Sequence, residues 1–393
     1  MKNFSRPLVI ATGLAWAGML GLGTHPASAE QSLPKQISVT AYGTASSGYA
    51  QLLAIGNVLK DKYGTDIRII PGKNDISRMI PLKKKAADYC ACSVAAYFAQ
   101  EGASIFGVRD WGPQRLFNIF NNGRGDNGLS FLVAKDSGIR SWADIKGKRV
   151  GTVVASPAVE YNTTGMLAFG GLTWNDVKRV EFPGFKQMVA GLVSGQVDAA
   201  FGNTTGAYTE QLAASPRGLV WLTYPHNDTA AWARFRKVTP YFNKRMVSVG
   251  VALDQNISGK LPYEGAGFPY PIYVSYGNKP ADEVYNLTKA ILDNYDAFAK
   301  AAPASSGYRL DRQVLSWVLP YHPGSIRYFQ EKGIWTKEAE AHNQMLLKRQ
   351  DVLAAAWTEM MSKDVSDDDF HAAWMKIRAR HLEAASMEVV FDH

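Results

Sequence analysis

Short polar turns carry the side chains of this sequence that are best suited to chemistry, and the chemistry they favour is ligand binding. Hydroxyl and amide groups donate and accept hydrogen bonds, so several of them together can hold a small polar molecule. The residues that we expect to contact a ligand are Thr44, Ser46, Ser47, Tyr49, Asn74, Ser93, Ser156, Tyr161, Asn162, Asn203, Thr204 and Thr205. Phe268 and Tyr270 could line the same pocket, although core packing is the better interpretation of both.

Motifs for catalysis and metal binding are absent from the sequence. No Gly-x-Ser-x-Gly, His-Glu-x-x-His or Walker-type loop is present, and the 7 histidines are dispersed. His322 lies in a Pro-Gly turn, where we expect a structural hydrogen bond. The basic side chains are scattered, so the net charge of +8 gives no support to nucleic-acid binding. We therefore predict no catalytic residue, no bound metal and no cofactor.

Cys90 and Cys92 are the two cysteines of the chain. A Cys-x-Cys pair lacks the additional His or Cys ligands that a metal site needs. A disulfide between residues i and i+2 would close a very small and strained ring. We predict two small residues buried on a strand, and Cys92 is the thiol that an enzyme on this fold could use as a nucleophile.

Three stretches place polar turns between a strand and a helix. Residues 37–63, 149–169 and 198–212 each begin with an apolar strand, continue through a Gly, Ser, Thr or Asn turn and end in a helix-period segment. Strands that alternate with helices predict parallel sheets. Such sheets bind ligands beyond the carboxyl ends of their strands, where helix N-termini favour an anion. One such turn could merely cap a helix, but three without a catalytic group favour a binding site.

The length of 393 residues exceeds what one ordinary core needs and fits two α/β lobes with an extension. We predict a discontinuous first lobe at 30–132 and 247–336, a second lobe at 133–246 and a C-terminal helical extension at 337–393. Each lobe is expected to be a mainly parallel sheet flanked by helices. Two crossings between the lobes would allow them to close on a ligand.

The first residues have the pattern of a cleaved signal peptide at 1–29. Lys2 and Arg6 supply a positive start, residues 8–22 are apolar, and Ala27–Ala29 is a small-x-small cleavage signature. The apolar run is shorter than the roughly 20 residues that a membrane-spanning helix needs. We therefore expect export to the periplasm, with no membrane insertion of the mature chain.

Five stretches of the sequence resemble motifs of known receptors. Leu132–Val150 resembles the strand and following helix of periplasmic type II binding proteins, a pattern that many transporter families share. Four other stretches are similar to motifs of the TAXI family of TRAP transporter solute receptors, namely Gly43–Tyr49, Pro183–Phe201, Pro280–Tyr295 and Pro320–Gly333. The resemblance extends in order from about residue 37 to residue 335.

This resemblance implies a periplasmic binding protein of type II fold, which is not an enzyme. It implies a receptor that binds a small organic anion, in most relatives a carboxylate, between its lobes. The partner implied is a TRAP membrane permease, driven by an ion gradient rather than by ATP. Two alternatives stay open from the sequence: a periplasmic subunit that reports the ligand to a membrane kinase, and an enzyme on the same fold.

Several positions depart from the family pattern. Ser46 and Ser47 stand where the family usually has glycines, and Val159 replaces a threonine in the second-lobe turn. These changes favour a different or bulkier ligand than glutamate. Lys73 and Arg78 are the nearest candidates for a charge that clamps the ligand, although solvent exposure is the simpler expectation for Lys73. The resemblance gives the C-terminal extension no function.

Overall fold

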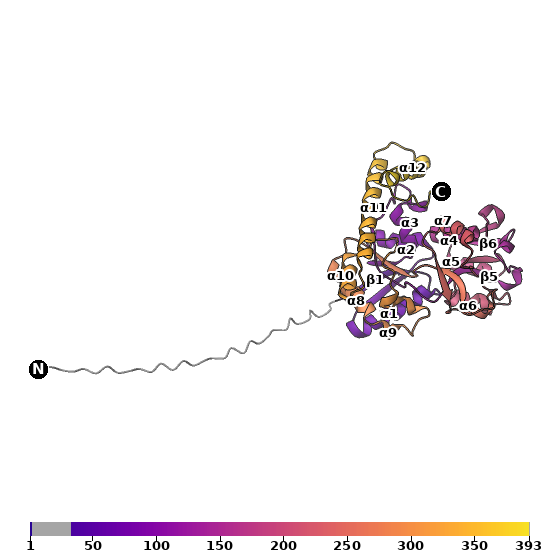
Figure 1. The fold of residues 1–393 in the computed structure, drawn as a ribbon, viewed down its shortest axis with the longest axis horizontal. Helices are drawn as coiled ribbons and strands as arrows, with labels where there is room; N and C mark the ends of the chain where they lie inside the picture. Colours follow the sequence, from indigo (N-terminus) through magenta and orange to yellow (C-terminus); the bar gives the residue numbers. More distant parts are fainter. Residues whose placement is uncertain (2–32, 393) are drawn as a thin grey trace.

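The computed structural model describes residue 1 and residues 33–392, which form two lobes side by side with a helical extension on the first (Figure 1). Apart from Met1, the predicted signal peptide at 1–29 lies outside the described residues. No helix within 33–392 is long and apolar enough to cross a membrane. The sheets confirm the predicted class, a two-lobed periplasmic binding protein of type II fold with C-terminal helices.

The first lobe is built on a five-stranded sheet. Its strands are β1 (Gln36–Ala41), β2 (Asp66–Pro71), β3 (Tyr89–Ala91), β4 (Leu116–Asn121) and β12 (Ile272–Tyr276), in the order β2-β1-β3-β12-β4. Its helices are α1 (Ser47–Tyr63), α2 (Asp75–Lys83), α3 (Ala95–Glu101), α8 (Ala281–Leu292), α9 (Tyr295–Phe298) and α10 (Pro323–Glu331). Alternate residues of β1, Ile37 and Val39, pack with Leu52 and Ile55 of α1 in the core of this lobe.

The second lobe repeats this plan. Its strands are β5 (Leu129–Ala134), β6 (Arg149–Val153), β7 (Lys178–Phe182), β8 (Ala199–Asn203) and β9 (Leu219–Val220), in the order β7-β6-β8-β5-β9. Its helices are α4 (Pro157–Phe169), α5 (Phe185–Val193), α6 (Ala207–Ala214) and α7 (Thr229–Val238).

Both sheets are mixed but mainly parallel, as predicted, because four of the five strands in each run in the same direction. β1, β2 and β3 are parallel to one another, but β12 is antiparallel to β3 and β4. β6 is parallel to β7 and β8, but β5 is antiparallel to β8 and β9. The antiparallel strands β5 and β12 are those that enter each sheet directly from the other lobe, so they run against its parallel strands.

The chain returns to the first lobe later than the predicted residue 247. β10 (Asn243–Val247) and β11 (Tyr263–Gly267) form an antiparallel pair. Leu253, in the loop between them, is buried in the core of the second lobe. Residues 247–267 therefore lie on the second lobe, because β11 pairs back on β10 before the chain crosses over.

Two crossing segments, residues 122–128 and 268–271, join the lobes side by side. The N–H of Tyr270 donates to the carbonyl of Asn122 at 3.0 Å, and the N–H of Asn122 donates to the carbonyl of Pro271 at 2.9 Å. The Arg245 side chain donates to the carbonyl of Asn127 at 3.1 Å. The two crossings thus form one bonded waist between the lobes.

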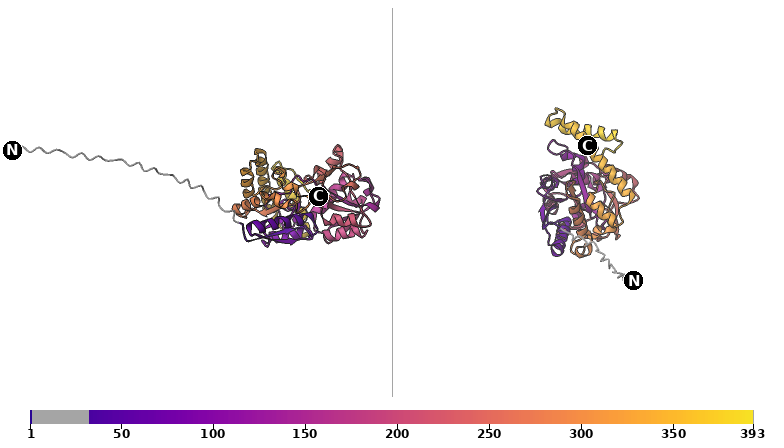
Figure 2. Two further views of the ribbon diagram at one scale, coloured as in Figure 1. Left: turned by 90° about the horizontal axis from the view of Figure 1, so that it is seen from below. Right: turned by 90° about the vertical axis from the view of Figure 1, so that its left-hand side faces the viewer.

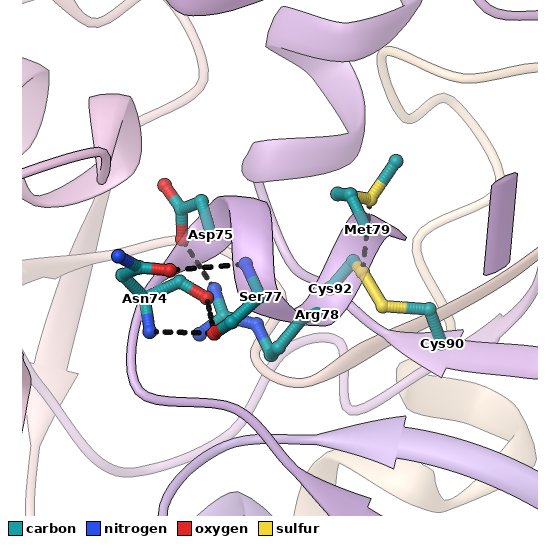
Figure 3. Close-up of a disulfide and its surroundings, with 7 residues drawn as sticks. All are labelled: Asn74, Asp75, Ser77, Arg78, Met79, Cys90 and Cys92. Carbon is teal, nitrogen blue, oxygen red and sulfur yellow. Dashed lines mark hydrogen bonds and ion pairs between the residues drawn. A yellow bond between two sulfur atoms is a disulfide. The ribbon is translucent and has the colours of Figure 1, made fainter. Parts of the chain in front are cut away.

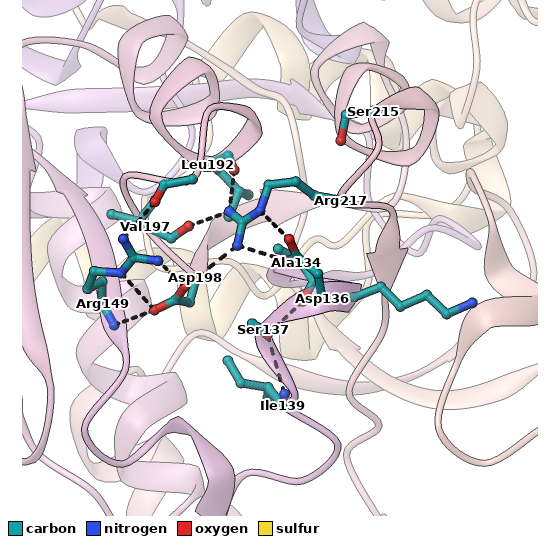
Figure 4. Close-up of polar contacts among 12 residues, drawn as sticks. Ala134, Asp136, Ser137, Ile139, Arg149, Leu192, Val197, Asp198, Ser215 and Arg217 are labelled. Atoms are coloured by element: carbon teal, nitrogen blue, oxygen red, sulfur yellow. Dashed lines mark hydrogen bonds and ion pairs between the residues drawn. The ribbon is translucent and has the colours of Figure 1, made fainter.

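A charged cluster fixes the amino ends of β6 and β8 in the second lobe (Figure 4). Asp198 accepts hydrogen bonds from the backbone N–H of Arg149 at 2.9 Å and from its Nε at 3.0 Å. Arg217 lies between Asp198 and Asp136, with its Nη2 2.9 Å from the Asp136 carboxylate. Burial opposes ionisation of Asp198, but the bonds from Arg149 and the charges of both arginines hold its pKa below the ordinary value. This cluster lies at the strand ends opposite those expected to bind a ligand.

The C-terminal extension consists of two helices that pack on each other and on the first lobe (Figures 1 and 2). They are α11 (Lys337–Met361) and α12 (Asp367–Ala384). Met360, Phe370 and Trp374 are buried in a small core between them. The indole Nε1 of Trp374 donates to the carbonyl of Gly102 at 2.6 Å, which attaches the extension to the end of α3.

A buried ion cluster makes the same attachment. Glu101, at the end of α3, is fully buried. Arg349 of α11 donates to both of its carboxylate oxygens at 2.7 Å, and Arg378 of α12 donates to Oε2 at 2.6 Å. Burial opposes ionisation of Glu101, but the hydrogen bonds and charges of the two arginines outweigh it and hold its pKa below the ordinary value.

The end of the chain lies between the two lobes. Phe391 is 4% exposed, and its ring centre lies 4.3 Å from that of Phe98 in α3 and 5.3 Å from that of Tyr161 in α4. Tyr97 of α3 adds a third ring at 5.0 Å. In Figure 1 the C-terminus accordingly lies between the extension and the second lobe.

Candidate ligand-binding site

A cavity lies between the lobes, where the loops after β1, β2 and β3 face the loops after β6 and β8. It contains about 670 Å³ of space not filled by atoms, part of which is open to solvent. These loops follow the carboxyl ends of parallel strands, as the sequence pattern predicts. Polar turns of the two lobes therefore face each other across one cavity.

The structure brings several of the predicted site residues together at this cavity. Those that line it are Ser46, Asn74, Ser93, Ser156, Asn162 and Asn203. Phe268 and Tyr270 also line it, and so do both candidate cations, Lys73 and Arg78. Lys73 is exposed, as expected, whereas Arg78 is 7% exposed.

Three other predicted residues belong to the first lobe and do not line the cavity. Thr44 is exposed on the turn before α1. Tyr49 is partly buried and packs against the first-lobe core. Ser47 is buried, and its hydroxyl accepts a hydrogen bond from the side-chain amide of Asn203 at 3.2 Å, across the two lobes.

The other three predicted residues are used by the fold of the second lobe. Tyr161 packs against Phe98 and Phe391, away from the cavity. The Thr204 hydroxyl accepts from the N–H of Gly128 at 2.9 Å and donates to the carbonyl of Val249. Thr205 bonds to the Asn203 side chain at 3.3 Å. Hydroxyls near a chain crossing satisfy backbone groups there, which a sequence pattern does not distinguish from ligand contacts.

Arg78 is the buried cation of the cavity. It forms an ion pair with Asp75 one helical turn earlier in α2, and both side chains are almost fully buried (Figure 3). Its guanidinium lies 4.5 Å from the centre of the Tyr42 ring. Within the described part of the chain, the Nε of Arg78, the hydroxyl of Ser93 and the hydroxyl of Tyr42 are buried with no hydrogen-bond partner.

Asn74 begins α2 and also reaches the second lobe. Its side-chain oxygen accepts from the N–H of Ser77 at 3.0 Å, while the Ser77 hydroxyl accepts from the N–H of Asn74, which completes a capping box. The Asn74 amide donates to the carbonyl of Val154 at 3.2 Å. The same residue thus fixes α2 and joins the two lobes.

Asp75 occupies the N-terminus of α4 in the opposite lobe. Its Oδ2 accepts a hydrogen bond from the N–H of Ala158 at 2.8 Å. Ser156 stands at the N-cap position before Pro157, but its hydroxyl makes no capping hydrogen bond. The negative group that a helix N-terminus favours is therefore supplied by the first lobe itself.

The phenols of the cavity remain protonated. Burial raises the pKa of Tyr42 well above its ordinary value, against the opposing charge of Arg78. Burial also raises the pKa of Tyr270 to about 12, and it raises the pKa of Tyr208. All three hydroxyls can therefore donate hydrogen bonds at neutral pH.

Sequence reasoning missed Tyr42, Asp75 and Tyr208 as cavity residues. Tyr42 follows β1 directly, and Asp75 follows Asn74 in the turn after β2, so their place after a strand was a usable signal. Tyr208 lies in the first turn of α6, where its aromatic character fits a core as well as a cavity. Within residues 33–392, no group of three or more His, Cys, Asp or Glu side chains could hold a metal ion.

Cys90 and Cys92 form a disulfide behind the cavity (Figure 3). Both are fully buried, as predicted, but the expectation that they would not be bonded is wrong. β3 ends at Ala91 and the chain turns at Ser93, which has a φ of 52°. The Cα atoms of Cys90 and Cys92 lie 5.2 Å apart, within the range of ordinary disulfides. The Sγ of Cys92 lies 3.1 Å from the Sδ of Met79 in α2.

Several solved structures are similar to this chain at low sequence identity. The alkanesulfonate-binding protein SsuA from Xanthomonas axonopodis pv. citri, bound to MOPS, is 14% identical with a TM-score of 0.38, covering 78% of this chain and 96% of that chain. The periplasmic aliphatic sulphonate binding protein SsuA from Escherichia coli is 15% identical with a TM-score of 0.36, covering 91% of each chain. An amino acid ABC transporter substrate-binding protein from Streptococcus pneumoniae, bound to L-arginine, is 13% identical with a TM-score of 0.40, covering 68% of this chain and 93% of that chain.

The family assignment comes from a profile that spans both lobes. The profile of the NMT1-like family matches residues 43–333, from the first polar turn to the end of α10. The matched region contains all residues that line the cavity except Tyr42, and it excludes the C-terminal extension. This chain belongs to the NMT1-like family.

Proposed function

We propose that this chain is the extracytoplasmic solute receptor of a TRAP-type secondary transporter of the TAXI kind. It binds a small organic anion, a carboxylate, between its lobes and delivers it to the membrane permease. The observation that carries the proposal is a cavity in which hydroxyl and amide groups of both lobes surround the buried guanidinium of Arg78. A site divided between two lobes with a narrow waist can release its ligand by opening.

We also propose that residues 1–29 direct export to the periplasm and are then cleaved, and that the mature chain has no enzymatic activity. Cys92, the candidate nucleophile, is buried and bonded to Cys90. A disulfide supports an oxidising compartment such as the periplasm. Among the described residues that line the cavity, no serine is bonded to a histidine or carboxylate side chain that could activate it.

The proposal is tested by identifying the ligand that the protein retains. Mature protein purified without refolding would be measured by native mass spectrometry, and the released molecule identified. Carboxylates would then be screened by thermal unfolding, because a ligand at a hundred times its Kd stabilises the folded state by about 2.7 kcal/mol. We expect binding without turnover, seen as an unchanged ligand mass after long incubation. A screen in which no carboxylate shifts the unfolding temperature would contradict the proposal.

Uptake measurements distinguish transport from sensing or catalysis. In cells that contain this receptor, uptake of the identified ligand should stop when the ion gradient is dissipated and should persist when ATP is depleted. Loss of uptake on ATP depletion with the gradient intact would exclude a TRAP-type partner. Ligand binding without any receptor-dependent uptake would instead support a sensory role.

A further inference from the structure

The cavity contains two places suited to an anion, and the protein itself fills one of them. The N-terminus of α4 is the first, and the Asp75 carboxylate already accepts its Ala158 N–H at 2.8 Å. The second is the guanidinium of Arg78, which lines the cavity and whose Nε is buried without a hydrogen-bond partner among the described residues. The Ser93 hydroxyl, in a residue that is 5% exposed, is also unpartnered there.

The positive and negative charges around Arg78 nearly cancel. Arg78 and Asp75 form a buried pair, so the interior of the cavity has no large excess of positive charge. Lys73 adds one positive charge at the exposed rim. One bound anionic group can be neutralised by this arrangement. A second anionic group would lie beside Asp75 without a cation of its own, and a buried unpaired charge is strongly disfavoured.

Apolar side chains from both lobes also line the cavity, beside its polar groups. They are Val94, Leu129, Val159, Phe185, Phe201 and Phe268. Burial of apolar surface contributes about 25 cal/mol for each Å² removed from water. A short, doubly charged ligand would leave these walls uncovered, whereas a ligand with a ring or a branched chain would bury them.

We propose that the ligand of this cavity is a monocarboxylate with an apolar body about the size of a phenyl ring. Arg78, Ser93 and Tyr42 hold the single carboxylate, and Asp75 excludes dianions by occupying the α4 N-terminus. This inference rests on the proposed receptor function and names the class of its ligand. Asp75 thereby becomes a residue that determines specificity as well as an interlobe contact.

The test compares two ligands that differ by one charge at nearly the same size. Phenylmalonate is a dianion at neutral pH, and its monoamide is a monoanion. Isothermal titration of the full mature chain should show the monoamide binding at least about tenfold more tightly, because the second carboxylate meets Asp75. Phenylacetate should also bind more tightly than acetate or succinate, because only phenylacetate covers the apolar walls.

Two substitutions assign the effect to named residues. Asp75→Asn keeps the size of the side chain and removes its charge, so it should bring the two phenyl ligands to within about threefold of each other. Arg78→Lys keeps the charge and loses the Nε donor, so it should weaken binding of all the monocarboxylates. Asp66→Asn, at an exposed acidic residue of β2, is the matched control and should leave the preference unchanged.

The outcomes separate this inference from the proposed function. Equal or tighter binding of phenylmalonate or succinate would overturn the inference and leave a carboxylate receptor in place. The wild-type comparison stands even if the Asp75→Asn protein does not fold. Failure of every carboxylate to bind would overturn the proposed function as well.

Discussion

The molecule contains two buried carboxylate–arginine sites that look alike in chemistry and differ in completeness. At the extension, both oxygens of Glu101 are bonded by Arg349 and Arg378, which come from two different helices. In the cavity, Asp75 has the single arginine Arg78, and the Nε of that arginine has no partner among the described residues.

The difference indicates what each site can do. Two arginines bond both oxygens of Glu101. The Nη1 of Arg378 is also buried without a hydrogen-bond partner among the described residues, but no residue of the Glu101 cluster lines the cavity, so this cluster attaches the extension to α3. Arg78 does line the cavity, so its unpartnered Nε could donate to an anion there while Asp75 stays paired. The same pair of residue types is thus structural in one place and suited to binding in the other.

The largest loss of stability is expected from a substitution at Glu101, the carboxylate that two arginines bond. Glu101→Gln leaves Arg349 and Arg378 buried without a counter-charge, which typically costs about 3–5 kcal/mol of unfolding free energy. Urea unfolding of the mature protein measures this loss. Glu359→Gln, which alters a carboxylate paired with His381 and Arg380 near the surface, is the control and should lower the unfolding free energy far less than Glu101→Gln does. Equal losses for the two variants would contradict the structural role of Glu101.

Protonation of Glu101 at low pH should remove the same stabilisation without a mutation. The pKa of Glu101 is lower in the folded protein than its ordinary value of 4.5. Its contribution to stability is therefore fully present above that value and is lost as the pH falls through the folded pKa. Urea unfolding between neutral and strongly acidic pH measures the loss. Other carboxylates also titrate there, so the prediction concerns the difference between wild type and Glu101→Gln, which should shrink as the pH falls.

A substitution at Arg78 in the cavity should lower ligand affinity more than it lowers stability. Arg78→Gln removes the buried cation, while Asp75 keeps its hydrogen bond from Ala158. We expect affinity for a carboxylate ligand to fall by more than about tenfold, which corresponds to 1.4 kcal/mol. The unfolding free energy should fall by less than in Glu101→Gln. A stability loss as large as that of Glu101→Gln, with unchanged affinity, would show that the two sites have the same role.

The smallest changes in stability and affinity are expected from removal of the disulfide between Cys90 and Cys92. Replacing both Cys90 and Cys92 by serine opens a very short loop, for which chain entropy predicts a loss below about 2 kcal/mol. Thermal unfolding and ligand titration of the double variant measure the effect. Affinity should change little, because neither sulfur lines the cavity. A large loss of affinity would mean that the disulfide positions Ser93, the next residue in the chain.

The lobes could be predicted from the sequence because their signals are local. Alternation of strands and helices and the polar turns after strands predict the sheets and the edge at which the cavity lies. The return crossing could not be placed, because the sequence does not show with which strand residues 263–267 pair. Its position depends on the pairing of β11 with β10, which is a non-local contact.

The candidate site could be predicted in position but not in every residue. Ser46, Asn74 and Asn203 lie where polar turns after strands indicate. Tyr161 points away from the cavity because Phe391, more than two hundred residues later, fills the space beside it. The capping of α4 by Asp75 also escaped prediction, since it joins two lobes whose contact no local pattern encodes.

The position of Phe391 affects how easily the two lobes can separate. Its ring touches Phe98 on one lobe and Tyr161 on the other, so it can keep both neighbours only while α3 and α4 stay together. If the lobes open and these helices separate, one face of the Phe391 ring must become exposed to water. Removal of the last residues should therefore make opening easier. Phe391 therefore favours the arrangement in which α3 and α4 lie together, from a position outside the cavity.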